Sequence, residues 1–243
     1  MNRNQKIRWI SFLILFVCFF SESSSEEKLD SKLYIDSASL KIESILPPPF
    51  ELGSKESQHE LEDMKSIIAK LDSSQKDLAI KDALNLSVSF FSDTLPDFDI
   101  DKLPRTKKLF DHVKFNAGYE SKLFKNYFMS KRPYQVDSNI QACVPPVPDN
   151  LNRSYPSGHT TLGYAMGIIL ANLIPEKSKQ IMERARLYGE NRINCGAHYP
   201  SDVVGGQVLG TIVAIELLKN NEFKLLMQES KNELALAGIT RGI

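Results

Sequence analysis

The residues best suited to chemistry in this sequence are His198 and Asp202. Asp202 follows His198 at i+4, so the two side chains meet if a helix begins between them, and Pro200 is compatible with such a start. A carboxylate on one ring nitrogen leaves the other nitrogen unprotonated and nucleophilic. The chain has three other histidines. Of these, His59 is predicted to be solvent-exposed and His112 to be a structural or surface residue, and His159 is discussed below. A His-x-x-x-Asp pair alone is more often a surface ion pair. Whether this pair is catalytic therefore has to be judged from the other residues around it.

Three cations in other segments favour an anion as the ligand. Lys125 and Arg132 are seven residues apart, which is two helical turns and predicts that they share one helix face. Arg192 is the third cation. Guanidinium groups match phosphate oxygens through paired hydrogen bonds, whereas a lysine acts as a point charge. This combination predicts a phosphate-binding site.

The stretch "NRSYPSGHTTLGYAMG" places a helix start beside these cations. Ser157 is a good helix N-cap, Gly158 lets another group approach the backbone, and the first N–H groups of the helix can bind an anion. His159 lies in the first turn of an apolar helix and needs a polar partner. A helix start, an oriented histidine, a second histidine and three cations together make a phosphoryl-transfer site.

Helices must position these residues. The segments "TTLGYAMGIILANLI" and "DVVGGQVLGTIVAIELL" are strongly apolar, and neither holds eighteen clean apolar residues, which favours core helices over membrane spans. Both carry small residues four apart, a pattern that lets helix backbones approach closely and that also occurs in membrane helix pairs. The small residues are Gly163, Gly167 and Ala171 in the first segment, and Gly206, Gly210 and Ala214 in the second.

The remaining pattern is also helical. Capping patterns at Ser57 and Ser74 predict two helix starts, and residues 104–130 read as a helical region interrupted at Gly118. Residues 46–54, "LPPPFELGS", read as an extended proline-rich arm over the helical body, with a mobile linker as the alternative. Strand signals are nearly absent, so we expect an all-α fold: a single-domain helical bundle.

Length and charge set wider bounds. The chain has 243 residues, 42% of them hydrophobic, which is enough for one sizeable core. Its 30 basic and 30 acidic residues cancel, which gives no support for a nucleic-acid or membrane-surface partner. Function must therefore come from local clusters.

The first residues resemble a secretory signal. "MNRNQKIR" is basic, "WISFLILFVCFF" is a short apolar run and "SESSSEE" is small and polar, which predicts a signal peptide over about residues 1–25, with an uncleaved anchor as the alternative. Export leaves Cys143 and Cys195 as an even pair. They either form one disulfide, which we favour, or are two buried thiols. A disulfide closing a loop of this length contributes about 4 kcal/mol in the chain-entropy model.

These motifs resemble a known signature. Lys-x6-Arg-Pro, Pro-Ser-Gly-His and Arg-x5-His-x3-Asp occur here in the order and spacing of the type 2 phosphatidic acid phosphatase superfamily, which also includes the vanadium haloperoxidases. "ILPPPFELGS", "SKRPY", "SYPSGHTT" and "CGAHYPSD" are similar to stretches of the bacterial class A non-specific acid phosphatases. The resemblance runs from about residue 33 to about residue 220. Asn191 departs from it, because the family usually has Ser before the arginine.

The resemblance implies a mechanism and a role for each motif residue. His198 attacks phosphorus and becomes a phosphohistidine, Asp202 orients it, and His159 protonates the leaving alcohol and then activates water. The phosphate oxygens are bound by five residues: Lys125, Arg132, Ser157, Gly158 and Arg192. The implied activity is that of a periplasmic or secreted acid phosphatase of broad specificity for small phosphomonoesters, with room for phosphotransferase activity and with an acid optimum. A Cys143–Cys195 bridge would tie two parts of this site together, and Asn191 is expected to act at one remove on Arg192.

Several alternatives remain beside this interpretation. A vanadate-dependent haloperoxidase would use the same His198, an integral lipid phosphatase is disfavoured by missing membrane spans, and a non-catalytic phosphoester-binding protein would have lost the reaction. A metallophosphatase is disfavoured because no His/Asp cluster has metal-ligand spacing, so no metal or other cofactor is implied. We expect vanadate to inhibit, no nucleic-acid partner and no stable membrane association after signal cleavage. The small-residue stripes and the apolar C-terminal helix leave room for a homodimer.

Overall fold

The computed structural model describes residues 32–146 and 151–241, and every regular element in those ranges is helical, which confirms the expected all-α class. The signal peptide predicted over residues 1–25 lies outside them. The α-helices are α1 Ile42–Ile45, α2 Lys55–Ala69, α3 Ser73–Leu84, α4 Pro104–Phe128, α5 Pro133–Val136, α6 Gly158–Leu173, α7 Ser178–Asn194, α8 Pro200–Lys219 and α9 Asn221–Leu236. Short 3-10 helices are η1 Ser37–Ser39, η2 Val88–Asp93, η3 Ile100–Lys102 and η5 Pro175–Lys177.

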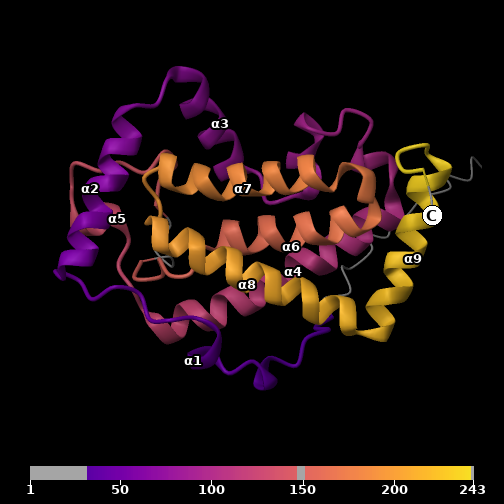
Figure 1. Ribbon diagram of the computed structural model, residues 1–243, viewed down its shortest axis with the longest axis horizontal. Helices are drawn as coiled ribbons and strands as arrows, with labels where there is room; N and C mark the ends of the chain where they lie inside the picture. Colours follow the sequence, from indigo (N-terminus) through magenta and orange to yellow (C-terminus); the bar gives the residue numbers. More distant parts are fainter. Residues whose placement is uncertain (1–31, 147–150, 242–243) are drawn as a thin grey trace, which may run out of the picture. The chain divides into compact units, whose positions relative to one another are not determined.

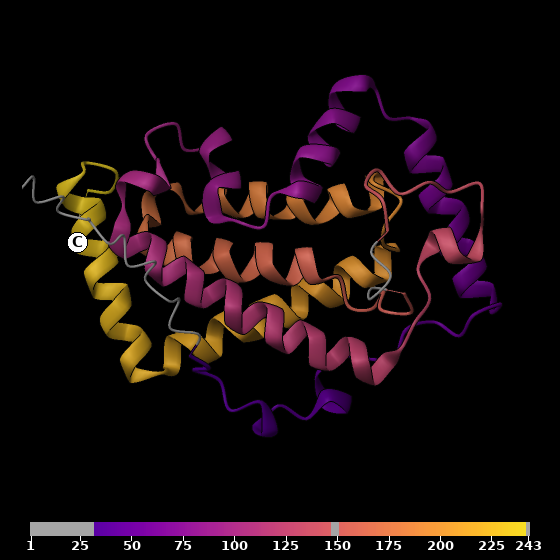
Figure 2. The ribbon, with the colours of Figure 1, turned by 180° about the vertical axis from the view of Figure 1, so that it is seen from behind.

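Helix α6 lies at the centre of the bundle and contacts α4, α7, α8 and α9 (Figure 1). Seen from behind, α4 runs across the face of α6 that is opposite the viewer in Figure 1 (Figure 2). The sequence explains this position, because α6 is apolar around most of its circumference and ten of its residues are buried. A helix of that kind is stable only when other helices cover it on all sides.

Small residues set the distance between α6 and α8, as predicted. A Cβ atom added at Gly206 would lie 2.6 Å from the carbonyl oxygen of Ser157, and one at Gly210 would lie 2.4 Å from that of Thr161. No side chain fits in that space, so only glycine allows this close crossing. On its other side, α6 uses Gly163 to accept an aromatic ring of α7.

Two predicted helix starts are displaced by a few residues. The N-cap of α2 is Ser54, whose side chain accepts a hydrogen bond from the Ser57 backbone N–H, and Ser57 itself lies inside the helix. The N-cap of α3 is Asp72, which forms a reciprocal capping box with Gln75, so the prediction at Ser74 was also wrong. In both cases an equally good capping residue stands two or three positions earlier and gives a longer helix.

The predicted break at Gly118 is absent. Helix α4 is continuous from Pro104 to Phe128, and Gly118 is exposed on its outer side. A glycine in a helix interior costs about 1 kcal/mol relative to alanine. The buried face of α4, which includes Phe110 and Phe124, outweighs that cost because burying one large apolar side chain contributes roughly 2 kcal/mol.

One helix in the described ranges, α8, is long and apolar enough to cross a membrane by length and composition. Half of its apolar window is buried inside the protein, against α6 and its neighbours. A core helix passes the same test, so this finding does not by itself indicate a membrane span.

The proline-rich stretch 46–54 has no regular structure apart from a turn, and it lies against the helices. Leu46 is buried, and the Tyr155 hydroxyl donates a hydrogen bond to the carbonyl oxygen of Pro47 at 2.9 Å. A cavity of about 600 Å³ separates Pro48–Leu52 from the C-terminal end of α4 and reaches Asp202 at the start of α8. The arm therefore borders the region in which the predicted site residues lie.

Candidate active site

His198 is held in the short connection between α7 and α8. Its side chain is buried, and its Nδ1 atom lies 3.1 Å from Oδ2 of Asp202. Helix α8 begins at Pro200, as expected, so His198 precedes the helix and Asp202 lies in its first turn. The contact is thus between a loop and a helix start, not between two turns of one helix.

Asp202 is the centre of a hydrogen-bond network. Besides His198, its Oδ2 atom accepts hydrogen bonds from the Ser154 hydroxyl at 2.5 Å and from the Tyr199 backbone N–H at 3.0 Å. Burial raises the pKa of Asp202 to about 6, and the hydrogen bond from Ser154 and the charge of Lys125 oppose that rise. Sequence reasoning missed Ser154, although it stands in the same stretch as the Pro-Ser-Gly-His motif.

Burial and surrounding cations keep His198 neutral. Burial is the largest cause that lowers the His198 pKa well below its ordinary value, and the charges of Arg132, Lys125 and Arg192 lower it further. A neutral ring that donates Nδ1–H to Asp202 has its lone pair on Nε2. Nε2 lies 3.0 Å from Nη1 of Arg132, so the nucleophilic atom faces a guanidinium group.

Lys125 and Arg132 converge, but for a different reason from the one predicted. Helix α4 ends at Phe128 and Met129 adopts a left-handed conformation with φ of 50°, so the two cations do not share a helix face. Lys125 lies in the last turn of α4, while Arg132 follows the turn and donates to the Ala197 carbonyl oxygen at 2.9 Å. The turn after α4 brings them together.

Lys125 is buried among other positive charges. Its ammonium group donates hydrogen bonds to the carbonyl oxygens of Arg153 at 2.7 Å and Ser154 at 2.9 Å. Burial, followed by the charge of Arg132, lowers the pKa of Lys125 well below its ordinary value. An anionic ligand would relieve both effects.

Arg192, in the last turn of α7, has unused donors. Its side chain is 4% exposed, and within the part of the chain that the structure describes neither Nε nor Nη1 has a hydrogen-bond partner. Burial lowers the pKa of Arg192 to about 10. Buried donors without acceptors are costly, and guanidinium groups bind oxyanions through paired hydrogen bonds. We define the cationic site as Lys125, Arg132 and Arg192 around His198.

The start of α6 forms one wall of the cationic site. Ser157 is the N-cap, as predicted, and its hydroxyl accepts a hydrogen bond from the Thr160 hydroxyl at 2.8 Å. A Cβ atom at Gly158 would lie 3.1 Å from the Ser121 hydroxyl oxygen and 3.5 Å from Cε of Lys125. The absent side chain at Gly158 thus lets α4 and its lysine approach the helix start.

His159 has a partner within the protein. Its Nε2 atom lies 3.1 Å from the carbonyl oxygen of Ala83, at the C-terminal end of α3. Donation of Nε2–H to that oxygen leaves Nδ1 as the other ring nitrogen, free to exchange a proton with a ligand. Burial and then the charge of Arg192 lower the His159 pKa well below its ordinary value, and the Ala83 carbonyl opposes them. Sequence reasoning had offered only a substrate oxygen as the partner.

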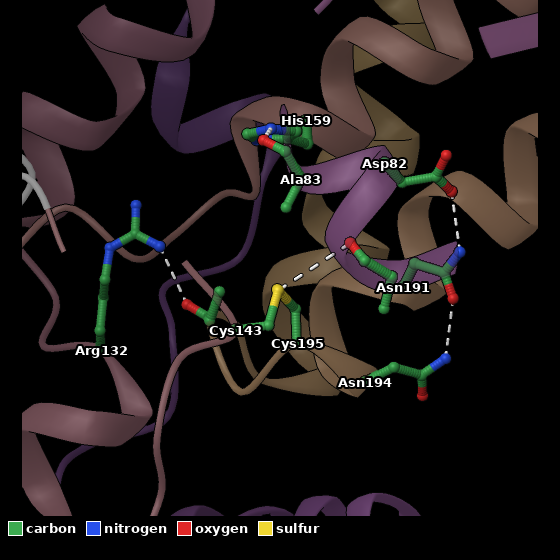
Figure 3. Close-up of a disulfide and its surroundings, with 10 residues drawn as sticks. Asp82, Ala83, Arg132, Cys143, His159, Asn191, Asn194 and Cys195 are labelled. Carbon is green, nitrogen blue, oxygen red and sulfur yellow. Dashed lines mark hydrogen bonds between the residues drawn. A yellow bond between two sulfur atoms is a disulfide. The ribbon is translucent and has the colours of Figure 1, made fainter. Parts of the chain in front are cut away.

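The disulfide favoured from the sequence is present between Cys143 and Cys195 (Figure 3). The Cys143 backbone N–H also donates to the Cys195 carbonyl oxygen at 2.9 Å. Figure 3 shows the bridge between Arg132 on one side and Asn191 with Asn194 on the other. The bridge thus connects the segment that follows Arg132 to the loop that carries His198.

Asn191 contacts α3 through its side chain, so it acts on the neighbouring Arg192 only indirectly, as expected. Its Nδ2 donates to Oδ2 of Asp82 at 2.8 Å, and its Oδ1 accepts from Asn194 at 2.9 Å. Asp82 also receives two hydrogen bonds from Arg184. This buried network joins α3 to α7 and thereby positions both the Ala83 carbonyl and the helix that carries Arg192.

The two other histidines lie outside the cationic site. His59 is exposed on α2, with Nε2 at 3.5 Å from Asp63, and His112 is buried edge-on against the ring of Tyr34. Across residues 32–146 and 151–241, no group of three or more His, Cys, Asp or Glu side chains is arranged to hold a metal ion. The residues that the structure does bring together are those of the three motifs.

Comparison with known proteins agrees with this geometry. Residues 113–224, which contain all three motifs, match the PAP2 superfamily. The chain is 31% identical over 198 residues to an acid phosphatase of Zymomonas mobilis, covering 79% of this chain and 75% of that protein. It is 29% identical over 202 residues to a non-specific acid phosphatase of Providencia stuartii, covering 79% and 80%. The chain therefore belongs to the PAP2 superfamily and, within it, to the bacterial non-specific acid phosphatases.

Proposed function

We propose that this protein hydrolyses phosphomonoesters through a phosphohistidine at His198. The observation that carries the proposal is the environment of that ring: Nδ1 faces Asp202 at 3.1 Å, and Nε2 faces Arg132 at 3.0 Å. A neutral, oriented imidazole whose lone pair points toward cations is suited to attack an anionic phosphoryl group. Relatives named acid phosphatase support the same class of reaction.

The first step forms a bond between His198 Nε2 and phosphorus and breaks the bond from phosphorus to the ester oxygen. The proton on Nδ1 of His159 passes to the leaving oxygen, which departs as a neutral alcohol. Arg132 has to move from Nε2 to a phosphoryl oxygen before attack, because its N–H group otherwise occupies the lone pair. Asp202 stabilises the positive charge that develops on the His198 ring.

The second step reverses these roles with water. Neutral His159 takes a proton from water, the oxygen attacks phosphorus, and the bond from phosphorus to Nε2 breaks to restore neutral His198 and release phosphate. An alcohol in place of water gives phosphate transfer by the same exchange of bonds. Lys125 and the two unpartnered donors of Arg192 stabilise the charge on the phosphoryl oxygens in both steps, with help from the backbone at Ser157 and Gly158.

The test is hydrolysis of p-nitrophenyl phosphate across pH, in excess EDTA, by the wild type, His198→Ala and the matched control His59→Ala. We expect an acid-peaked, EDTA-resistant activity that falls by about 10⁴-fold in His198→Ala and is unchanged in His59→Ala, because His59 is exposed on α2. Rapid quenching at alkaline pH should trap a phosphohistidine in the wild type. Wild-type activity retained by His198→Ala would contradict the proposal.

Vanadate gives an independent test of the phosphate site. We expect it to inhibit competitively and to raise the melting temperature of the wild type, because it resembles the phosphoryl group and would bind the unpartnered donors of Arg192. If the folded wild type hydrolyses no ester, peroxide-dependent halide oxidation with added vanadate tests the haloperoxidase alternative. Binding of phosphate without either reaction would indicate a phosphoester-binding protein.

We further propose that the protein works in the periplasm or outside the cell. The Cys143–Cys195 bridge supports this, since structural disulfides persist mainly in oxidising compartments. Residues 1–25 act as the signal peptide in this proposal, and residues 26–243 form the phosphatase domain. Mass spectrometry of the protein from a periplasmic extract, without reductant, tests both points: a chain that still begins near Met1 or that carries two free thiols would contradict them.

A further inference from the structure

A fourth cation, Arg153, is attached to the cationic site by its backbone. The Arg153 carbonyl oxygen accepts hydrogen bonds from Lys125 Nζ at 2.7 Å and from Arg132 Nη2 at 3.2 Å. Residue 153 is half-buried, whereas the side chains of Lys125 and Arg132 are nine-tenths buried. Arg153 therefore stands at the boundary between the buried cations and solvent.

Within residues 32–146 and 151–241, the guanidinium group of Arg153 has no hydrogen-bond acceptor. Among the described residues no carboxylate pairs with it and no side-chain or backbone oxygen accepts a hydrogen bond from it. Its charge is also one of those that lower the pKa of Lys125, which places the two charges close enough to repel. Two other arginines near the site differ, because Arg132 donates to Ala197 and Arg184 is paired with Asp82. Arg192 also has donors without acceptors among the described residues, but it is buried and faces the transferred phosphoryl group in the proposed reaction.

The proposed reaction assigns no role to the side chain of Arg153. The transferred phosphoryl group occupies Lys125, Arg132 and Arg192, all of which are buried, so the rest of the substrate has to extend toward the solvent boundary. In this scheme a second phosphate group on the leaving alcohol would bind the guanidinium group of Arg153, which has five N–H donors and, among the described residues, no paired carboxylate. A substrate with a neutral leaving group would leave the charge of Arg153 uncompensated.

We infer that Arg153 binds a second phosphate group of the substrate and makes phosphomonoesters whose leaving group carries such a group the preferred substrates. The inference rests on the proposed function. Arg153 is a specificity-determining residue in this scheme and takes no part in bond making, so its effect should appear in KM more than in kcat.

The experiment compares propane-1,3-diol bisphosphate with propyl phosphate, which has the same carbon chain and one phosphate. The measured quantity is the ratio of kcat/KM for the two esters in the wild type, Arg153→Gln, Arg153→Lys and the control Lys108→Gln. Gln keeps the backbone carbonyl that Lys125 and Arg132 use. Lys108 is an exposed cation of α4, 17 positions before Lys125 and thus about 25 Å away along the helix.

We expect the ratio to favour the bisphosphate in the wild type and to fall about tenfold in Arg153→Gln, as the loss of a charge-assisted hydrogen bond pair predicts. Arg153→Lys should retain part of the preference, and Lys108→Gln all of it. An unchanged ratio in Arg153→Gln, or an equal fall in Lys108→Gln, would overturn the inference.

The two proposals fail in different ways. A wild type that hydrolyses p-nitrophenyl phosphate, with a ratio that Arg153→Gln does not change, contradicts only the role of Arg153. A wild type that hydrolyses no ester contradicts the proposed function, and calorimetric binding of the same two esters to the same variants then decides the inference. Equal affinity of wild type and Arg153→Gln for the bisphosphate would overturn it.

Discussion

Two buried clusters of charged side chains in the described part of the chain differ in how their charges are balanced. The paired cluster joins α3 to α7, where Asp82 receives hydrogen bonds from both terminal nitrogens, Nη1 and Nη2, of Arg184 and from Asn191. Among the described residues, the cationic site has three cations and one carboxylate, Asp202, and two buried donors of Arg192 have no partner. Both clusters are nearly closed to solvent, so burial alone does not separate them.

The difference lies in balance. In the paired cluster the Arg184 guanidinium group is matched by the buried Asp82 carboxylate and lies 3.8 Å from the half-exposed Asp93 carboxylate. Negative charge therefore balances the buried positive charge, and these contacts hold α3 and α7 together. In the cationic site positive charge is in excess and donors lack acceptors, an arrangement that costs stability unless an anion binds. We therefore interpret the excess of buried positive charge as a ligand-binding site, and the balanced Asp82–Arg184 pair as a contact that stabilises the packing of α3 against α7.

The largest expected effect is on the paired cluster. Arg184→Gln should lower the free energy of unfolding by about 3–5 kcal/mol, because it leaves the buried Asp82 carboxylate without its cation. Arg186→Gln is the matched control: Arg186 is half-exposed on the same helix and pairs with Glu190, so its loss should cost less than about 0.5 kcal/mol. Urea unfolding of both variants measures the free energy of unfolding. Equal decreases in the two variants would show that the paired cluster does not stabilise the packing of α3 against α7.

The cationic site should respond in the opposite way. Arg192→Gln should lower kcat/KM for p-nitrophenyl phosphate by about 10²–10³-fold, the usual cost of removing a donor that stabilises developing charge. Its free energy of unfolding should not fall by more than about 1 kcal/mol, because no carboxylate loses a partner. Steady-state kinetics beside urea unfolding test this; a variant that is unstable but fully active would reverse the contrast between the clusters.

The pH dependence should follow the histidines of the cationic site. Because the pKa of His159 is lowered below its ordinary value of 6.5, its protonated fraction in the free enzyme falls about tenfold per pH unit above pH 6.5, and kcat/KM should fall with it. The lowered pKa values of His159 and His198 also mean that their contribution to stability is complete above pH 6.5 and is lost as the pH falls through the folded-state values. A kcat/KM that still rises above neutral pH would contradict the assignment of His159 as the acid.

The smallest effect is expected at Asn191, where the resemblance to the acid phosphatases led us to expect a serine. Asn191→Ser removes the hydrogen bond to Asp82 and should lower the free energy of unfolding by about 1 kcal/mol, since Arg184 still satisfies that carboxylate. Activity should stay within about twofold, since Arg192 is not touched directly. Kinetics and unfolding on this one variant decide both points, and a large loss of activity would show that Asn191 positions Arg192 more strongly than its contacts indicate.

Local patterns in the sequence predicted the helices and the three motifs, because apolar periodicity and capping residues act over a few positions. These patterns did not predict features that depend on contacts between residues far apart in the sequence. The convergence of Lys125 and Arg132 depends on a left-handed Met129 after α4, and the contact between His159 and Ala83 depends on how α3 packs on α7. Ser154 was missed because a serine carries no signal of its own until Asp202 is known to lie beside it.

The close crossing of α8 and α6 constrains how this enzyme can change over evolutionary time. Gly206 lies against the backbone of Ser157, the residue that starts the wall of the cationic site. Any side chain at position 206 would push that wall outward, so mutation there cannot be tolerated without loss of the site. At position 153, by contrast, the site uses the backbone carbonyl oxygen, which every residue type supplies. New substrate preferences are thus accessible through the rim of the site, while the helices beneath it stay fixed.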